Sequence, residues 1–157
     1  MRKSVIGHPA AAPSADAGPF LDLERLARVE VSSEDPAHPV ESALLPGRSG
    51  GWRAAGPGPQ LVRIVFDEPQ RVRRVRLVVE EHLVERTQEL ALFWSPSEAE
   101  APRALLRQQY TFSPGGAKRE VEDYAFDLNG VKVLALELVA DIRGGGTRAS
   151  IASLQVG

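Results

Sequence analysis

The 157-residue chain is 43% hydrophobic and 25% charged, has no cysteine, and carries a formal net charge of −2 with a pI of about 5.9. This composition suits one folded domain and excludes disulfides, cysteine-based zinc sites and a thiol nucleophile. The acidic balance disfavours binding to the phosphate backbone of DNA, and we attribute the excess of arginine over lysine mainly to the composition of a bacterial genome.

Residues 1–18 are rich in alanine, proline and glycine, so we expect a flexible lead-in ahead of a domain that spans residues 19–157. Pro9, Pro13 and Asp16 interrupt the start of the chain before a signal-peptide core can form. No stretch reaches the ~20 apolar residues that a bilayer span requires. We therefore expect a cytoplasmic protein that does not associate with membranes.

Two short helical segments are predicted before and between the first strands. Residues 19–27 place Phe20, Leu23 and Leu26 on one helical face, and a further helical turn is predicted at residues 40–45. No longer helical period occurs, so a parallel sheet built from strand–helix–strand units is not expected.

The dominant pattern after residue 28 is alternation of apolar and polar side chains, which is typical of strands with one buried and one solvated face. The clearest example is residues 74–80, where Val75, Leu77 and Val79 alternate with charged neighbours. Eight such runs are predicted as strands: 29–31, 62–66, 74–80, 90–94, 106–112, 124–128, 134–138 and 152–156.

Turn-forming residues separate these runs, and Asn129-Gly130 is the strongest hairpin signal in the chain. About eight antiparallel strands in two sheets is the number expected for a jelly roll. We therefore predict an all-β, jelly-roll β-sandwich with one or two short helices. Residues 34–60 form the one long irregular connection, and such connections are often functional.

Three local features of the chain resemble the opening of galactose-binding-like β-sandwiches. They are the segment Val31-Ser32-Ser33-Glu34-Asp35, the helix end at Leu44-Leu45 and the step Trp52-Arg53-Ala54-Ala55. The local similarity is highest to the N-terminal domain of the scaffold protein of single-strand-break repair, within a group that includes discoidin-type domains. The resemblance implies a jelly-roll sandwich with a binding surface on its loops. It does not identify a ligand, because the group binds sugars, phospholipids, nucleic acids and proteins.

The alternation of strand direction predicts which loops share an end of the sandwich. Connections 33–60, 81–87, 113–119 and 141–149 should meet at one end, and connections 67–72, 95–102 and 129–131 at the other. Polar and aromatic side chains gather at the first end, which we therefore predict to be the binding end. The predicted ligand-binding residues are His38, Trp52, Arg53, Glu81, Arg86, Asp141 and Arg143.

Each of these candidates also has a structural interpretation. Trp52 is either a platform for a ligand or a plug in the core, and Arg53 either binds a ligand or pairs with an acid in a neighbouring loop. Arg86 lies in a charged hairpin tip that is either solvated or hydrogen-bonding. Gln108 lies on an apolar face, where a buried amide needs partners, so it either pairs with backbone at a sheet edge or reaches into a pocket.

A calcium site built from Glu34 and Asp35 is a further alternative, because oxygen donors suit calcium, although His38 does not. The competing interpretation is that Asp35 caps the turn before the helix. We predict no metal and no cofactor.

The leading functional hypothesis is a non-catalytic module that recognises a carbohydrate or a similar polyol through the loop cluster. Protein–protein scaffolding is the alternative, through an exposed patch that includes Val65, Val78 and Phe93. DNA binding ranks third, and the oligomeric state is not determined. Catalysis is not expected, because adjacent carboxylates such as Glu80 and Glu81 face opposite sides of a strand.

Overall fold

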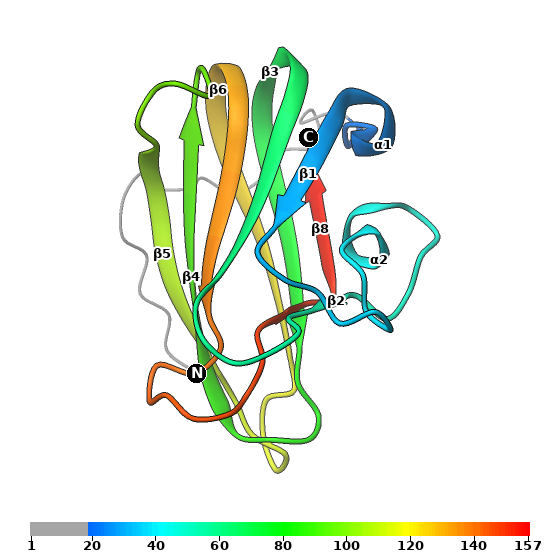
Figure 1. The fold of residues 1–157 in the computed structure, drawn as a ribbon, viewed down its shortest axis with the longest axis vertical. Coiled ribbons are helices and arrows are strands. Elements are labelled where there is room, and N and C mark those ends of the chain that lie inside the picture. Colours follow the sequence, from blue (N-terminus) through cyan, green and yellow to red (C-terminus); the bar gives the residue numbers. More distant parts are fainter. Residues whose placement is uncertain (1–18) are drawn as a thin grey trace.

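The computed structural model describes residues 19–157, which form a β-sandwich with two single-turn helices (Figure 1). All strand pairs within this range are antiparallel, which confirms the predicted all-β fold. None of its helices has the length and apolar character needed to cross a bilayer. The elements are α1 Leu23–Leu26, β1 Ala27–Val31, α2 Glu41–Leu44, β2 Trp52–Arg53, β3 Gln60–Glu80, β4 Arg86–Ser95, β5 Arg103–Phe112, β6 Arg119–Val139, β7 Ser150–Ile151 and β8 Ser153–Val156.

The two long strands β3 and β6 bend and contribute to both layers of the sandwich. The first part of β3 pairs with β1 and with the end of β6, and β6 continues to β4 and β5. The second part of β3 pairs with β8 and with the start of β6. A five-stranded layer therefore faces a three-stranded layer, and one core cluster of buried side chains draws on both.

The bends replace two of the turns that the sequence predicts. The prediction of a hairpin at Asn129-Gly130 is wrong, because β6 runs through this point without a loop. Gly130 has a φ of +69°, and the pairing of β3 with β6 shifts register opposite it, between Val65 and Arg74. The conformational freedom of glycine is used here for an irregular bend rather than for a hairpin. In Figure 1 both strands turn over at the upper end, so the predicted sharing of loop ends is retained.

Alternation along the strands fills the core as the pattern predicts. Ile64, Leu77, Leu92, Leu136 and Leu154 come from both layers and are almost fully buried. Burial of each such side chain contributes roughly 1.5–3 kcal/mol to folding. The core is therefore a major source of stability in a sandwich that has no disulfide.

The apolar patch considered for a scaffold partner does not form. Val65 and Val78 are both buried, and Phe93 is half-buried. The exposed apolar surface that the hypothesis requires is therefore absent at these three positions.

The predicted lead-in, residues 1–18, lies outside the described residues.

Candidate ligand-binding cleft

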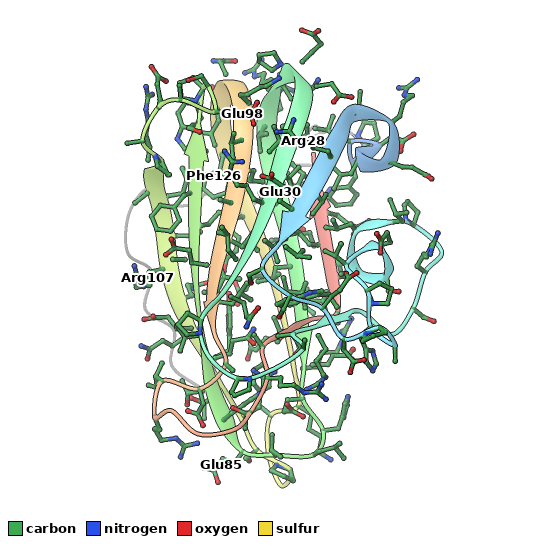
Figure 2. All side chains as sticks on the ribbon, in the orientation of Figure 1. Arg28, Glu30, Glu85, Glu98, Arg107 and Phe126 are labelled. Atoms are coloured by element: carbon green, nitrogen blue, oxygen red, sulfur yellow. The ribbon has the colours of Figure 1, made fainter. Side chains whose placement is uncertain are left out.

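The long early connection and the late glycine-rich turn meet at one end of the sandwich, as predicted. Strand β2 pairs with β7, with Trp52 opposite Ile151. The Ala54 amide donates to the Ala149 carbonyl at 2.9 Å. These contacts lie beside the label for β2, in the lower half of the molecule in Figure 1. In Figure 2 the labelled Glu85 marks the same end, whereas Glu98 lies at the opposite end.

A cleft of about 720 Å³ lies beside this junction. Its floor is the outer face of the three-stranded layer, with Val78 of β3 and Ser153 of β8 in register with each other. One wall is the segment 49–53 that precedes and includes β2, and the loop after β3 adds His82 and Leu83. Volumes between ~300 and 1,000 Å³ are typical of sites for small ligands.

Gly51 allows this wall to form. Its φ is +65°, and a β-carbon at this position would lie 2.5 Å from the Ile151 carbonyl oxygen and 2.8 Å from the Ala152 α-carbon. Only glycine permits both the left-handed backbone and this approach. The connection therefore closes directly against the β7–β8 backbone.

Guanidinium groups dominate the charge of the cleft. Arg53, Arg76, Arg119 and Arg148 line it, together with His38 and His82, whereas Glu80 is the one carboxylate among its lining residues in the described range. The chain as a whole is acidic. The cleft is therefore a local concentration of positive charge.

A buried polar cluster lies behind the cleft and holds its loops. The Arg86 side chain is 0% exposed and donates to Glu81 Oε1 at 2.7 Å, Gln88 Oε1 at 2.7 Å, the Ala140 carbonyl at 3.0 Å and Ser150 Oγ at 2.7 Å. Its partners belong to β4, to the loop after β3, to the residue that follows β6 and to β7. One guanidinium therefore joins four segments of the rim.

Glu81 is kept ionised within this cluster. Burial alone would raise the pKa of Glu81, but hydrogen bonds from Arg86 and the Leu83 amide, together with the charges of Arg86 and Arg53, hold that pKa below its ordinary value. Arg53 Nη1 lies 4.0 Å from Glu81 Oε1, at the boundary between the buried cluster and the cleft.

Three of the seven predicted ligand-binding residues, His38, Trp52 and Arg53, line the cleft. Trp52 borders the cleft but belongs to the core. It is 1% exposed, and its indole Nε1 donates to the Ser33 carbonyl at 3.0 Å. The structure therefore supports the core interpretation, because a platform needs an exposed ring. His38 Nδ1 lies 3.0 Å from the Gly50 carbonyl, and Arg53 is partly exposed.

Arg86 and Glu81, also predicted to contact a ligand, do not line the cleft. Both side chains are buried and pair with each other, so neither presents its charge to solvent. Sequence alternation placed both residues at the end where the predicted loops meet, but it did not reveal how deeply their side chains are buried.

Asp141 and Arg143 shape the late turn instead of lining the cleft. Asp141 Oδ1 accepts from the Arg143 amide at 3.1 Å and from the Thr87 amide at 3.4 Å. Burial alone would raise the pKa of Asp141. The hydrogen bonds from Arg143 and from the Thr87 amide, together with the charge of Arg143, instead lower this pKa below its ordinary value. The Asp141 carboxylate therefore fastens the turn to β4.

The carboxylates considered for a calcium site are engaged with protein donors. Asp35 accepts from the Ala37 amide at 2.9 Å and pairs with Arg148 at 3.1 Å. The hydrogen bond from the Ala37 amide lowers the pKa of Asp35. Burial acts in the opposite direction, and the hydrogen bond and charge of Arg148 lower this pKa further. Glu34 accepts from the Val40 amide at 2.8 Å, just before α2. Residues 19–157 hold no group of three or more potential metal-ligating side chains.

Comparison with solved structures finds the same architecture in carbohydrate-binding modules. The third family-32 module of a family-31 glycoside hydrolase from Clostridium perfringens superposes with a TM-score of 0.64 at 16% identity, covering 87% of this chain and 93% of that one. The family-32 module of AlyQ, solved with 4,5-unsaturated mannuronic acid, gives 0.59 at 16% identity over 84% and 95%. A pectin-binding module gives 0.58 at 14% identity over 85% and 91%.

The chain shares the β-sandwich architecture of these modules. At these identities the likeness establishes architecture alone. No protein-family model matches the sequence, and no curated protein matches it.

Within this fold, sequence reasoning missed several residues that line the cleft. Arg76 and Arg119 lie on the outer sheet face, His82 on the loop after β3, and Arg148 and Ser153 near β7. Alternation does place Arg76 on the outer face. No sequence signal shows that segment 49–53 covers that face, because the close approach at Gly51 becomes visible only in the structure.

Proposed function

We propose that this chain is a non-catalytic module that binds a carbohydrate in the cleft. The observation that carries the proposal is a cleft of suitable volume, rich in hydrogen-bond donors, at the end where the loops converge. Guanidinium and hydroxyl groups suit the hydroxyls of a sugar. The shared architecture of the carbohydrate-binding modules supports the same conclusion.

The apolar side of a sugar requires an apolar surface to lie on. Leu83 is 84% exposed and borders the cleft, so its side chain is available for this contact. Trp52 is not, because its ring is buried.

The acid groups at the cleft support binding over catalysis. Hydrolysis of a glycosidic bond commonly needs two carboxyl groups on either side of it. Glu80 lines the cleft, whereas its neighbour Glu81 lies on the buried side and pairs with Arg86. The described lining therefore offers one carboxylate.

Blocking the cleft tests the proposal. Ser153 points from β8 onto the cleft floor, so Ser153→Trp should fill the site without altering the core. Calorimetric titration with a panel of neutral and acidic oligosaccharides should detect binding to the native chain and at least a tenfold loss in this variant.

The matched control is Gln109→Trp, on the exposed face of the edge strand β5. This variant should bind as the native chain does, and both variants should keep the native melting temperature within a few degrees. Absence of binding to every saccharide, or equal binding by both variants, would refute carbohydrate recognition in this cleft.

A further inference from the structure

The cleft has more positive charge than its own carboxylates can neutralise. Among residues 19–157, four guanidinium groups line it against one carboxylate, that of Glu80. Arg119 Nε lies 3.2 Å from Glu80 Oε1, and His82 Nε2 lies 3.6 Å from Glu80 Oε2, so two basic groups share one acid. Arg148 is partly neutralised by Asp35 from outside the cleft.

Arg76 differs from the other three arginines because no carboxylate of residues 19–157 forms an ion pair with it. Its cross-strand neighbour Asp123 is bound instead by Arg74, through bonds of 2.9 and 2.8 Å. The remaining polar contact of Arg76 is a long one, 3.5 Å from Nη1 to Gln155 Oε1. The guanidinium of Arg76 is therefore available to an incoming anion.

The position of Arg76 allows such an anion to meet the rest of the site. It lies on β3 two residues before Val78 and four before Glu80, on the face that forms the cleft floor. Alternate residues of a strand point to the same face, so Arg76, Val78 and Glu80 form one row. A ligand seated over Val78 would have the Arg76 guanidinium at one side and Arg119 with Glu80 at the other.

We propose that the saccharide bound in this cleft is a uronate, with its carboxylate on Arg76. This inference rests on the proposed function and specifies its ligand class. The planar guanidinium matches a carboxylate through two parallel hydrogen bonds, a geometry that a neutral hydroxyl cannot reproduce. The carboxylate supplies the counter-charge that the cleft lacks, while the sugar ring lies beside the exposed side chain of Leu83.

The test compares acids with their esters. Trimers of galacturonate, glucuronate, mannuronate and guluronate are titrated calorimetrically, each beside its methyl ester, in which the ring is kept and the charge removed. At least one acid should bind at least tenfold more tightly than its ester. Raising sodium chloride from about 50 to 500 mM should weaken the acid and leave the ester unchanged, because salt screens charge.

Arg76→Gln should weaken that acid by about tenfold to a hundredfold, the range expected for losing a hydrogen-bonded charge, and should change its ester by less than threefold. The matched control is Arg71→Gln, which removes an arginine from an exposed pair with Asp127 at the opposite end. This control should leave both affinities unchanged.

The outcomes separate this inference from the proposed function. If neutral sugars or esters bind as tightly as the acids, or if Arg76→Gln weakens acid and ester equally, the uronate inference fails and carbohydrate binding stands. If no saccharide binds, both fail. A sulfated trisaccharide and a single-stranded oligonucleotide are further arms, and Arg76-dependent binding of either one without any uronate would overturn the inference.

Discussion

Substitution of Arg86 by methionine should destabilise the fold strongly. Methionine keeps much of the side-chain volume but removes four hydrogen bonds and leaves the Glu81 carboxylate buried without its counter-ion. Breaking a buried ion pair from one side costs about 3–5 kcal/mol. Because domains of this size are typically stable by about 5–15 kcal/mol, Arg86→Met should still fold, and its urea midpoint should fall sharply.

An exposed pair provides the control for this magnitude. Arg71 and Asp127 have side chains that are 49% and 68% exposed, so Arg71→Met should cost less than about 1 kcal/mol. Adding Glu81→Gln to Arg86→Met removes the uncompensated charge and should recover part of the loss. If Arg86→Met costs no more than Arg71→Met, the argument that the buried pair holds the rim together is refuted.

The same pair should make stability depend on pH in a defined direction. Because the pKa of Glu81 is lowered in the folded state, its contribution is present above the unfolded value of about 4.5 and is lost as the pH falls through the folded value. The difference in unfolding free energy between the native chain and Glu81→Gln should therefore be constant from pH 7 to about pH 5 and should shrink below it. A difference that grows on acidification would contradict this sign.

Two further substitutions test the packing around the cleft and core. Gly51→Ala should lower the free energy of unfolding in urea by at least about 2 kcal/mol, because it adds a close contact to a strained backbone. Gly47→Ala is the control: Gly47 has a φ of +76° but open space around it, so the loss should be about 1 kcal/mol. Equal losses would contradict the close approach at Gly51. The Tyr110 hydroxyl donates to Gln108 Oε1 at 2.9 Å and shares a hydrogen bond of 2.6 Å with the Tyr124 hydroxyl. Tyr110→Phe loses both bonds and Tyr124→Phe loses one, so the melting temperature should fall further in Tyr110→Phe. The reverse order would refute this account.

The fold could be predicted because its determinants are local. Alternation over residues 74–80 or 134–138 depends on one buried face, and the structure places Val75, Leu77 and Val79 in the core accordingly. Direction reversal at each break then fixed which loops share an end. The error at Asn129-Gly130 left this unaffected, because a bend between layers reverses the chain as a hairpin does.

Depth could not be predicted from the same information. Alternation distinguishes one side of a strand from the other, but not whether another segment covers that side. Arg86 and Arg53 therefore looked equivalent in sequence, although Arg86 has four protein partners and Arg53 faces the cleft. Gln108 shows the same difficulty, since its hydrogen-bond partner is the Tyr110 hydroxyl within the core.

The character of the cleft follows from how the acids of the chain are distributed, not from how many there are. Asp123 is held by Arg74, Glu81 by Arg86, and Asp35 by a backbone amide together with Arg148. Each of these carboxylates is neutralised outside the cleft or behind it. An acidic protein can therefore present a basic site, because binding depends on the charges that face the ligand, and net charge averages over those that do not.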